Sequence, residues 1–446
     1  MSRYLLLYIC LAFLLVLYDS YIAIPVLFAV VFINIAKDKI KAFSLIGLLY
    51  FLIFNGVFSL NYIHSHVFYF PLNWGIKDIF FNTFLIKILF LLFLAIGILF
   101  KLFNSISQLS IFILLLYLNF HFYDNPEVLV SINLFILVYS KFYWPLMYAK
   151  KFYNQKKVLP GFLMPFWETY SVEAAPKLRS VVDLNDLDNS LGYMKNGLRL
   201  ILWALILKFT ALVLNDIVFN SGFILDSSFT LNIKNYKYMN LAIYNSMNIP
   251  FFEKWLAILM NTLFFLMYEV AGDSGVVIGL ARLCGIQLFR NTYKPYKATN
   301  FEDFFRRLYF YYNEIIVNFF FFPIWKKIRF IKHKKLKLFT VTFTSILIGG
   351  ALIHLVRDVD LFFKKPLPEA GICFLNRFPY FLSLAFFISI SVSLRRKKQS
   401  KNKYKRLIFV MIYFIVYAVI LNSQTNYLQC KINYQYDFIL NLFKFK

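Results

Sequence analysis

Charged residues are scarce in this chain of 446 residues: they make up 16% of the composition, against roughly a quarter in soluble domains. Hydrophobic residues account for 60%, and phenylalanine alone occurs 56 times. A soluble fold cannot hide that much apolar side chain, because even a large domain leaves much of its surface in water. The composition therefore excludes a soluble enzyme, a disordered chain and a collagen. It predicts an all-α, polytopic membrane protein.

Acidic residues are outnumbered by basic ones, 22 to 48, so the formal net charge is +26. In a soluble protein this excess would suggest nucleic acid as a partner. Here most of the charge lies in short loops between apolar runs, which is typical of positive-inside topology and of contact with anionic lipid headgroups. We therefore expect membrane lipids, and no nucleic acid, as partners.

Cysteine is also rare, and no CxxC pair occurs, so we expect neither a zinc site nor a redox motif. Three of the four cysteines lie in apolar runs, where a cysteine is ordinarily a small buried hydrophobe; the four are Cys10, Cys284, Cys373 and Cys430. We expect no bound metal and no bound cofactor.

A membrane-spanning helix needs about 20 mostly apolar residues. The chain has roughly eleven such runs, at about 4–18, 21–36, 43–60, 79–100, 107–123, 127–149, 197–219, 254–271, 338–356, 373–394 and 406–421. Basic loops alternate with non-basic ones between these runs, which places 150–196, 326–337 and 395–406 in the cytoplasm and the tail from Asn422 outside. We divide the chain into N-terminal helices (1–149), a cytoplasmic loop with short helices (150–196), a core (197–358) and C-terminal helices with a tail (359–446).

The apolar run 304–325 does not fit a simple span. Basic segments on both sides of it favour the cytoplasm, and the run itself begins with Arg306-Arg307. We predict a re-entrant or interfacial element in which both arginines pair with nearby carboxylates such as Glu302 or Asp303.

Among the five histidines, His354 stands out because it ends an apolar run. Ionisable residues within membrane segments are rare and suggest function, although a hydrogen bond to a neighbouring helix would also explain one. The other four lie in loops or at helix ends, where a solvated role is expected; they are His64, His66, His121 and His333.

An ordered series of motifs surrounds this histidine. A segment rich in small residues, from Asp273 through Arg282 to Gly285, precedes Asn-x-x-x-Pro-Tyr, which is Asn291, Pro295 and Tyr296 here. Phe-Phe-Arg-Arg-Leu-Tyr follows, with Arg306, Arg307 and Tyr309, and the apolar helix then ends in Ile353-His354-Leu355.

Over about residues 266–358, this series resembles the membrane-bound O-acyltransferase (MBOAT) superfamily, and within it the bacterial branch of the alginate O-acetylation and teichoic-acid D-alanyl transfer proteins. The family's Arg-Arg-Trp-His element has Tyr309 in place of its histidine. Ile353 and Leu355 replace the tryptophan and glycine beside the catalytic histidine, and Asn318 falls where the family has an Arg-Asp pair.

The resemblance implies a helical bundle with an internal cavity in the bacterial cytoplasmic membrane, and a catalytic role for His354. Tyr309 and Asn318 are further catalytic candidates. Substrate-binding or structural roles are implied for Asp273, Arg282, Asn291, Pro295, Tyr296, Arg306 and Arg307.

The implied activity is transfer of an acyl group, in the first instance acetyl, from acyl-CoA or an acyl-carrier thioester to a hydroxyl of an extracytoplasmic or lipid-linked glycan. A neutral histidine can accept the hydroxyl proton. No Gly-x-Ser-x-Gly element occurs, which favours direct transfer without an acyl-enzyme. Two alternatives stay open: a polysaccharide transporter or flippase, and an inactive MBOAT-like scaffold of an envelope-modification complex with partner proteins.

Overall fold

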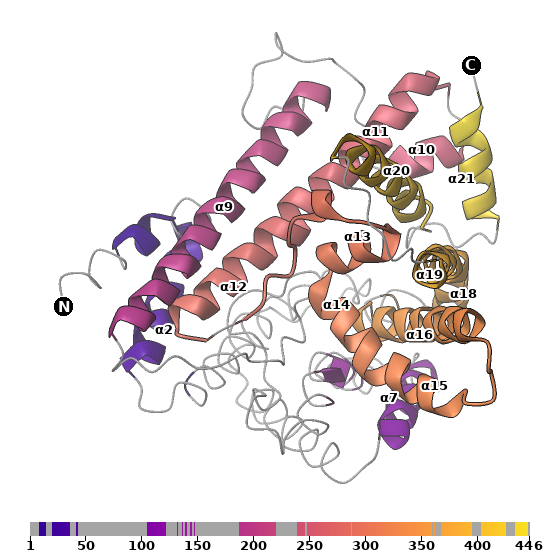
Figure 1. Ribbon diagram of the computed structural model, residues 1–446, viewed down its shortest axis with the longest axis horizontal. Helices are drawn as coiled ribbons and strands as arrows, with labels where there is room; N and C mark the ends of the chain where they lie inside the picture. The colour runs from indigo at the N-terminus through magenta and orange to yellow at the C-terminus, as the bar shows by residue number, and fades with distance from the viewer. Residues whose placement is uncertain are drawn as a thin grey trace, which may run out of the picture.

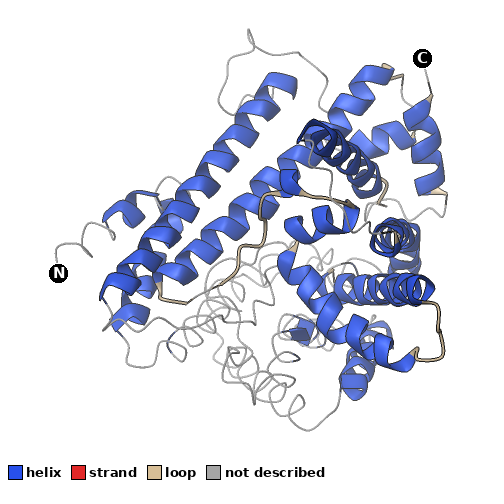
Figure 2. Ribbon diagram, in the orientation of Figure 1, coloured by secondary structure: helices blue, strands red, loops and turns tan. Residues whose placement is uncertain are grey.

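The structure is a computed structural model that describes residues 9–14, 20–35, 42, 105–121, 132, 136, 139–140, 143–144, 147, 187–219, 239–245, 248–286, 288–358, 361, 367–394, 403–424 and 433–444. The described part is helical and contains no strand, which agrees with the predicted all-α class (Figures 1 and 2).

The N-terminal half contributes α2 (Ser20–Ile35), α7 (Ser105–His121), α9 (Leu187–Phe219) and α10 (Met239–Tyr244). One long helix follows, made of α11 (Phe251–Phe264), the π-helical η3 (Phe265–Asp273) and α12 (Ser274–Leu283). The next elements are short: η4 (Pro295–Lys297), α13 (Phe301–Leu308), α14 (Phe310–Ile315), the π-helical η5 (Ile316–Phe321) and α15 (Phe322–Lys327). The chain then forms α16 (Lys334–Arg357), α18 (Leu367–Leu375), α19 (Phe378–Ser393), α20 (Lys403–Asn422) and α21 (Tyr434–Phe443).

Five of these helical stretches are long and apolar enough to cross a membrane: Gly192–Phe219, Phe251–Leu283, Lys334–Arg357, Glu369–Ser393 and Tyr404–Asn422. They indicate a membrane protein, and each falls on an expected run. The runs 43–60 and 79–100 lie outside the described residues, and α2 and α7 have only 16 and 17 residues. The count of eleven spans therefore stays a prediction.

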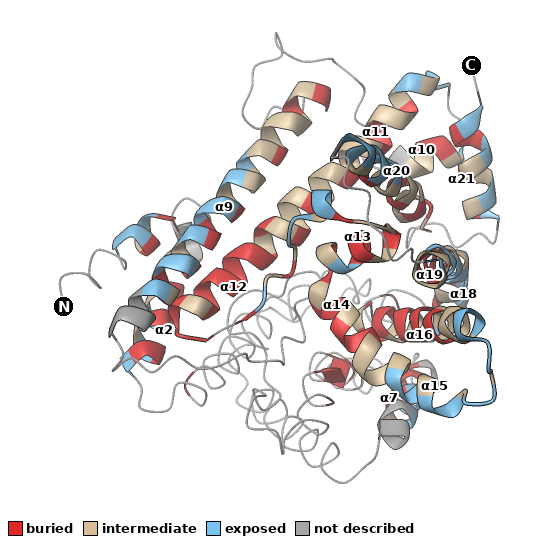
Figure 3. Cartoon of the chain, in the orientation of Figure 1, coloured by how far each residue is buried: buried red, intermediate tan, exposed pale blue. Residues whose placement is uncertain are grey.

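Small residues bring α12 and α9 close together. A Cβ atom on Gly279 would lie 2.5 Å from Cγ1 of Ile201, and one on Gly275 would lie 2.8 Å from Cβ of Ala204. The two helices run side by side, and α12 is largely buried (Figures 1 and 3). The glycine-rich segment thus packs helix against helix, as expected for small residues in a membrane. The expected helix 254–271 does not end there; it continues to Leu283.

Two glycines of α9, Gly197 inside this contact and Gly192 outside it, offer a stability test. We expect Gly197→Ala to lower the unfolding free energy by about 1–3 kcal/mol, because its Cβ would lie 2.7 Å from the backbone oxygen of Gly279, which cannot rotate away. Gly192→Ala is the matched control, since nothing lies within 4 Å of that Cβ. Alanine there should raise helix stability by about 0.5–1 kcal/mol. Thermal unfolding in lipid nanodiscs compares the two, and equal melting temperatures would contradict the close contact.

The run 304–325 is divided between α13 and one continuous helix over 310–327, made of α14, η5 and α15, with the break at Tyr309 (Figure 1). None of the five candidate spans includes it. The structure therefore shows a helix break at Tyr309 within this run, while a re-entrant or interfacial position and its depth in the membrane stay a prediction.

His333 is exposed and ends the lysine-rich loop, as expected, and its Nδ1 accepts a hydrogen bond from the backbone N–H of Leu336 at 3.2 Å at the start of α16. It caps the helix. Cys373 was interpreted as a buried hydrophobe, but it forms a disulfide.

Candidate functional site

The sequence places His354 in the last turn of α16, about 30 Å along the helix axis from Lys334. Its side chain is only 9% exposed. Asp358 follows one turn later, and Oδ2 of Asp358 lies 3.2 Å from Nδ1 of His354. Residues four apart share one face of a helix, which explains why the two side chains meet.

Two arginines bind the same carboxylate. Nε of Arg357 donates to Oδ1 of Asp358 at 2.8 Å, and Nη1 of Arg377 donates to Oδ2 at 2.8 Å. Burial alone would raise the pKa of the Asp358 carboxyl, but the charge of Arg357 holds this pKa well below its usual range. Asp358 is therefore an anion that can orient the imidazole ring. We call His354, Arg357, Asp358 and Arg377 the histidine cluster.

Aromatic side chains of α14 and α19 lie beside the histidine cluster. The ring centroids of Tyr380 and Phe381 lie 6.1 and 5.0 Å from that of His354. A Cβ on Gly350, one turn before His354, would lie 2.8 Å from the hydroxyl oxygen of Tyr312. The glycine thus leaves room for a tyrosine hydroxyl close to the histidine.

Tyr309 is a catalytic candidate, although packing alone would also explain an aromatic residue here. Its hydroxyl shares a hydrogen bond with that of Tyr417 at 2.5 Å, and its ring meets that of Tyr312 edge to face at 6.5 Å. Tyr309 therefore contacts Tyr312, the tyrosine whose hydroxyl lies beside Gly350. Asn318 lies half-buried on η5, which packs against α16.

The predicted ion pairs of the double arginine are confirmed. Oδ1 of Asp303 lies 2.7 Å from Nη2 of Arg306 and 3.1 Å from Nε of Arg307, and Arg306 also approaches Glu302 at 3.3 Å. Asp303 further accepts the backbone N–H of Thr299 at 3.1 Å. These contacts tie the start of α13 together and do not involve the histidine cluster.

This arrangement predicts an acid-sensitive contact. Burial alone would raise the pKa of Asp303, but the hydrogen bond and charge of Arg307 lower it below its usual value. A lowered pKa adds stability above the unfolded-state value and loses it as the pH falls. We expect the wild type to lose stability below about pH 4 and Asp303→Asn to be less stable at neutral pH by about 1–3 kcal/mol.

Unfolding as a function of pH measures this effect, with Glu302→Gln as the control. The Glu302–Arg306 pair is more exposed and should contribute only about 0–1 kcal/mol. If Asp303→Asn and Glu302→Gln lose the same unfolding free energy at neutral pH, Asp303 does not stabilise the start of α13 as inferred.

The Asn-x-x-x-Pro-Tyr motif has a structural role. Asn291 is buried, and its backbone oxygen accepts the N–H of Phe310 at 3.1 Å. Pro295 opens η4, while Tyr296 is 56% exposed. Arg282 donates through Nε and Nη2 to the backbone oxygen of Leu288 at 3.1 and 2.7 Å. These four residues shape the connection between α12 and α13.

Asp273 belongs to a separate charged contact. Nζ of Lys208 in α9 lies 2.5 Å from Oδ1 of Asp273 and 3.8 Å from the ring centroid of Tyr268. Both charged residues lie within candidate spans. Their pairing explains how two charges are tolerated at that depth.

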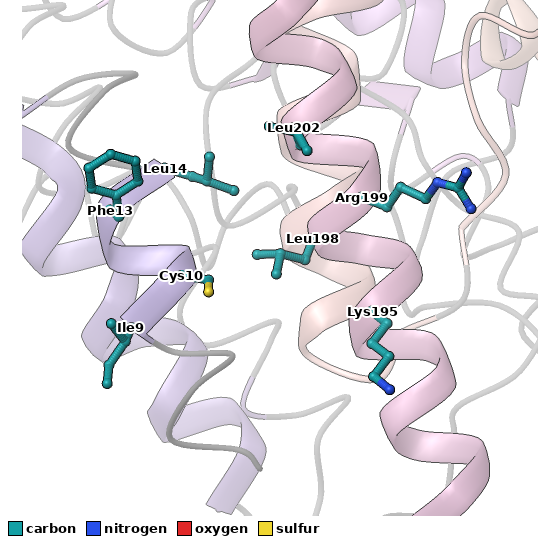
Figure 4. A pocket seen from close by; sticks show the side chains of 8 residues that line it. All are labelled: Ile9, Cys10, Phe13, Leu14, Lys195, Leu198, Arg199 and Leu202. Atoms are coloured by element: carbon teal, nitrogen blue, oxygen red, sulfur yellow. The ribbon is translucent and has the colours of Figure 1, made fainter. Parts of the chain in front are cut away.

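Within the described residues, no group of three or more histidine, cysteine, aspartate or glutamate side chains could hold a metal ion. A cavity of about 580 Å³ lies between residues 9–14 and α9. Figure 4 shows its lining, in which Leu198 and Leu202 face Cys10 and Leu14. It contains none of the predicted site residues, and a cavity beside His354 stays a prediction.

Comparison with known protein families finds no match to this chain, and comparison with curated proteins finds none either. The resemblance to the MBOAT superfamily therefore rests on the ordered motifs alone.

Sequence reasoning missed most of the histidine cluster. Asp358 could have been found, because it stands four residues after His354 at the end of the same apolar run. Arg377 gives no such signal, since only the packing of α19 against α16 brings it to the cluster.

Proposed function

We propose that this chain is a membrane-bound O-acyltransferase of the bacterial cytoplasmic membrane. It moves an acyl group, in the first instance acetyl, from a CoA or carrier-protein thioester to a hydroxyl of an extracytoplasmic or lipid-linked glycan. The observation that supports this best is the buried pair of His354 and Asp358 at the end of a membrane-crossing helix.

The pair has the chemistry that the transfer requires. The acceptor oxygen attacks the thioester carbonyl carbon, and its proton passes to Nε2 of His354 while Asp358 holds the proton on Nδ1. The carbon–sulfur bond then breaks, and the leaving thiolate takes the proton from Nε2. A histidine–carboxylate pair needs no covalent intermediate for these steps.

Envelope partner proteins would complete the path of the acyl group. If α16 begins in the cytoplasm, as its basic start indicates, His354 lies near the extracytoplasmic face. That position favours an acceptor presented from outside, while the donor enters from the cytoplasm.

Transfer can be tested with the full chain in proteoliposomes containing cell-envelope glycan lipids and radiolabelled acetyl-CoA. Label should appear in the glycan fraction, and it should disappear in variants of His354. Label that appears equally with these variants would reject His354 as the base, and no label with any acyl thioester would reject the activity.

One observation favours the transporter as a second candidate. The Lys208–Asp273 pair puts charge within two spans outside the histidine cluster, and intramembrane charges often mark transport pathways. Movement of a labelled glycan lipid across the bilayer without an acyl donor would support this alternative. An inactive scaffold would show neither transport nor acylation.

A further inference from the structure

Three atoms of the histidine cluster form a close triangle. Nδ1 of His354 lies 2.6 Å from Nη2 of Arg357 and 3.2 Å from Oδ2 of Asp358, and Nη2 lies 3.3 Å from the same Oδ2. A guanidinium can only donate hydrogen bonds, and a carboxylate can only accept them. Nδ1 therefore accepts a hydrogen bond if its partner is Arg357 and donates one if its partner is Asp358.

The distance of 2.6 Å between Nδ1 of His354 and Nη2 of Arg357 decides which role Nδ1 has. With a hydrogen on Nδ1, two N–H groups would oppose each other at 2.6 Å, so Nδ1 accepts from Arg357 in this arrangement. The two hydrogens on Nη2 can serve Nδ1 and Oδ2 together, and Oδ2 also accepts from Arg377. A neutral imidazole with an accepting Nδ1 carries its proton on Nε2.

We propose that Arg357 holds His354 in this Nε2–H tautomer and releases it when an anionic group of a substrate, a phosphate or a carboxylate, draws the guanidinium away. Water then takes the proton from Nε2 and delivers one to Nδ1, so that Nδ1 becomes the donor to Asp358 and Nε2 becomes the free base. Arg357 is thus a positioning residue. Its role in freeing Nε2 to act as the base rests on the proposed acyl transfer.

The surroundings of the ring allow this exchange. The side chain of Arg357 is 22% exposed and that of Arg377 only 7%, so Arg357 is the arginine that a ligand can reach. Tyr380 and Phe381 pack against the ring and keep its position while the proton changes sides. After the exchange, Asp358 keeps its bond to Arg377.

The tautomer can be read directly by nitrogen NMR on the full chain in nanodiscs, grown with isotope-labelled histidine. The signal of His354 is identified by its loss in His354→Asn. The wild type should show a protonated Nε2 and an unprotonated Nδ1. Arg357→Met, which keeps an apolar stem, should reverse this assignment. Arg357→Ala provides a second variant if the first does not fold.

Arg377→Lys is the matched control, because it alters a cation on Asp358 without touching the ring; it should leave the wild-type tautomer in place. A wild type with protonated Nδ1, or an unchanged tautomer in both Arg357 variants, would overturn the proposal. Saturating inorganic phosphate, which reaches both faces of a nanodisc and supplies the anion, should shift the wild type toward protonated Nδ1. No shift would refute release by an anionic group. Because the spectra need no turnover, an expected tautomer without acyl transfer would reject the proposed function alone.

Discussion

Replacing His354 with alanine is expected to lower acyl transfer by about 10²–10⁴-fold, the usual contribution of a general base. The structure adds a requirement to this experiment, because the ring also packs against Tyr380 and Phe381. His354→Gln should therefore accompany it, since glutamine fills more of the space without acting as a base. Label incorporated from radiolabelled acetyl-CoA measures transfer, and membrane yield measures folding.

His333→Ala is the control for this prediction. His333 caps the start of α16, so its loss should cost about 0.5–2 kcal/mol of stability, as the loss of a helix cap does. Transfer per folded molecule should stay near the wild-type value. If His333→Ala and His354→Gln lose transfer equally, His354 has no special role and the scaffold alternative becomes the leading one.

Replacing Asp358 with alanine is expected to cost about 3–5 kcal/mol in unfolding free energy. Asp358 neutralises Arg357 and Arg377 in a buried setting, and removal of one partner leaves the others without compensation. A loss of this size is a large part of the stability of most domains, so the variant should unfold at a much lower temperature in nanodiscs. Asp358→Asn keeps the shape and separates the charge from the packing.

Asp437→Ala is the matched control, because Asp437 lies in the first turn of α21, away from the histidine cluster. Its interaction with the helix dipole contributes only about 0.3–1 kcal/mol. Similar melting temperatures for Asp358→Ala and Asp437→Ala would show that the arginines do not depend on Asp358 as the contacts indicate.

The class of the protein and several helix positions follow from the sequence alone. A bilayer requires about 20 apolar residues per span, and the run 338–356 corresponds to the helix Lys334–Arg357. The pairing of Arg306 with Asp303 was also predictable, because residues three apart meet on one helix face. Both results depend only on distances along the chain.

Tertiary structure decided the rest. The bond of Tyr309 to Tyr417, the ion pair of Lys208 with Asp273 and the contact of Arg377 with Asp358 join side chains 108, 65 and 19 residues apart. Helical periodicity says which face of a helix a residue occupies, but not which helix will cover that face. The sequence therefore determined that His354 lies at the end of a membrane helix, while the packing of the helices decided which charges and hydroxyls surround it.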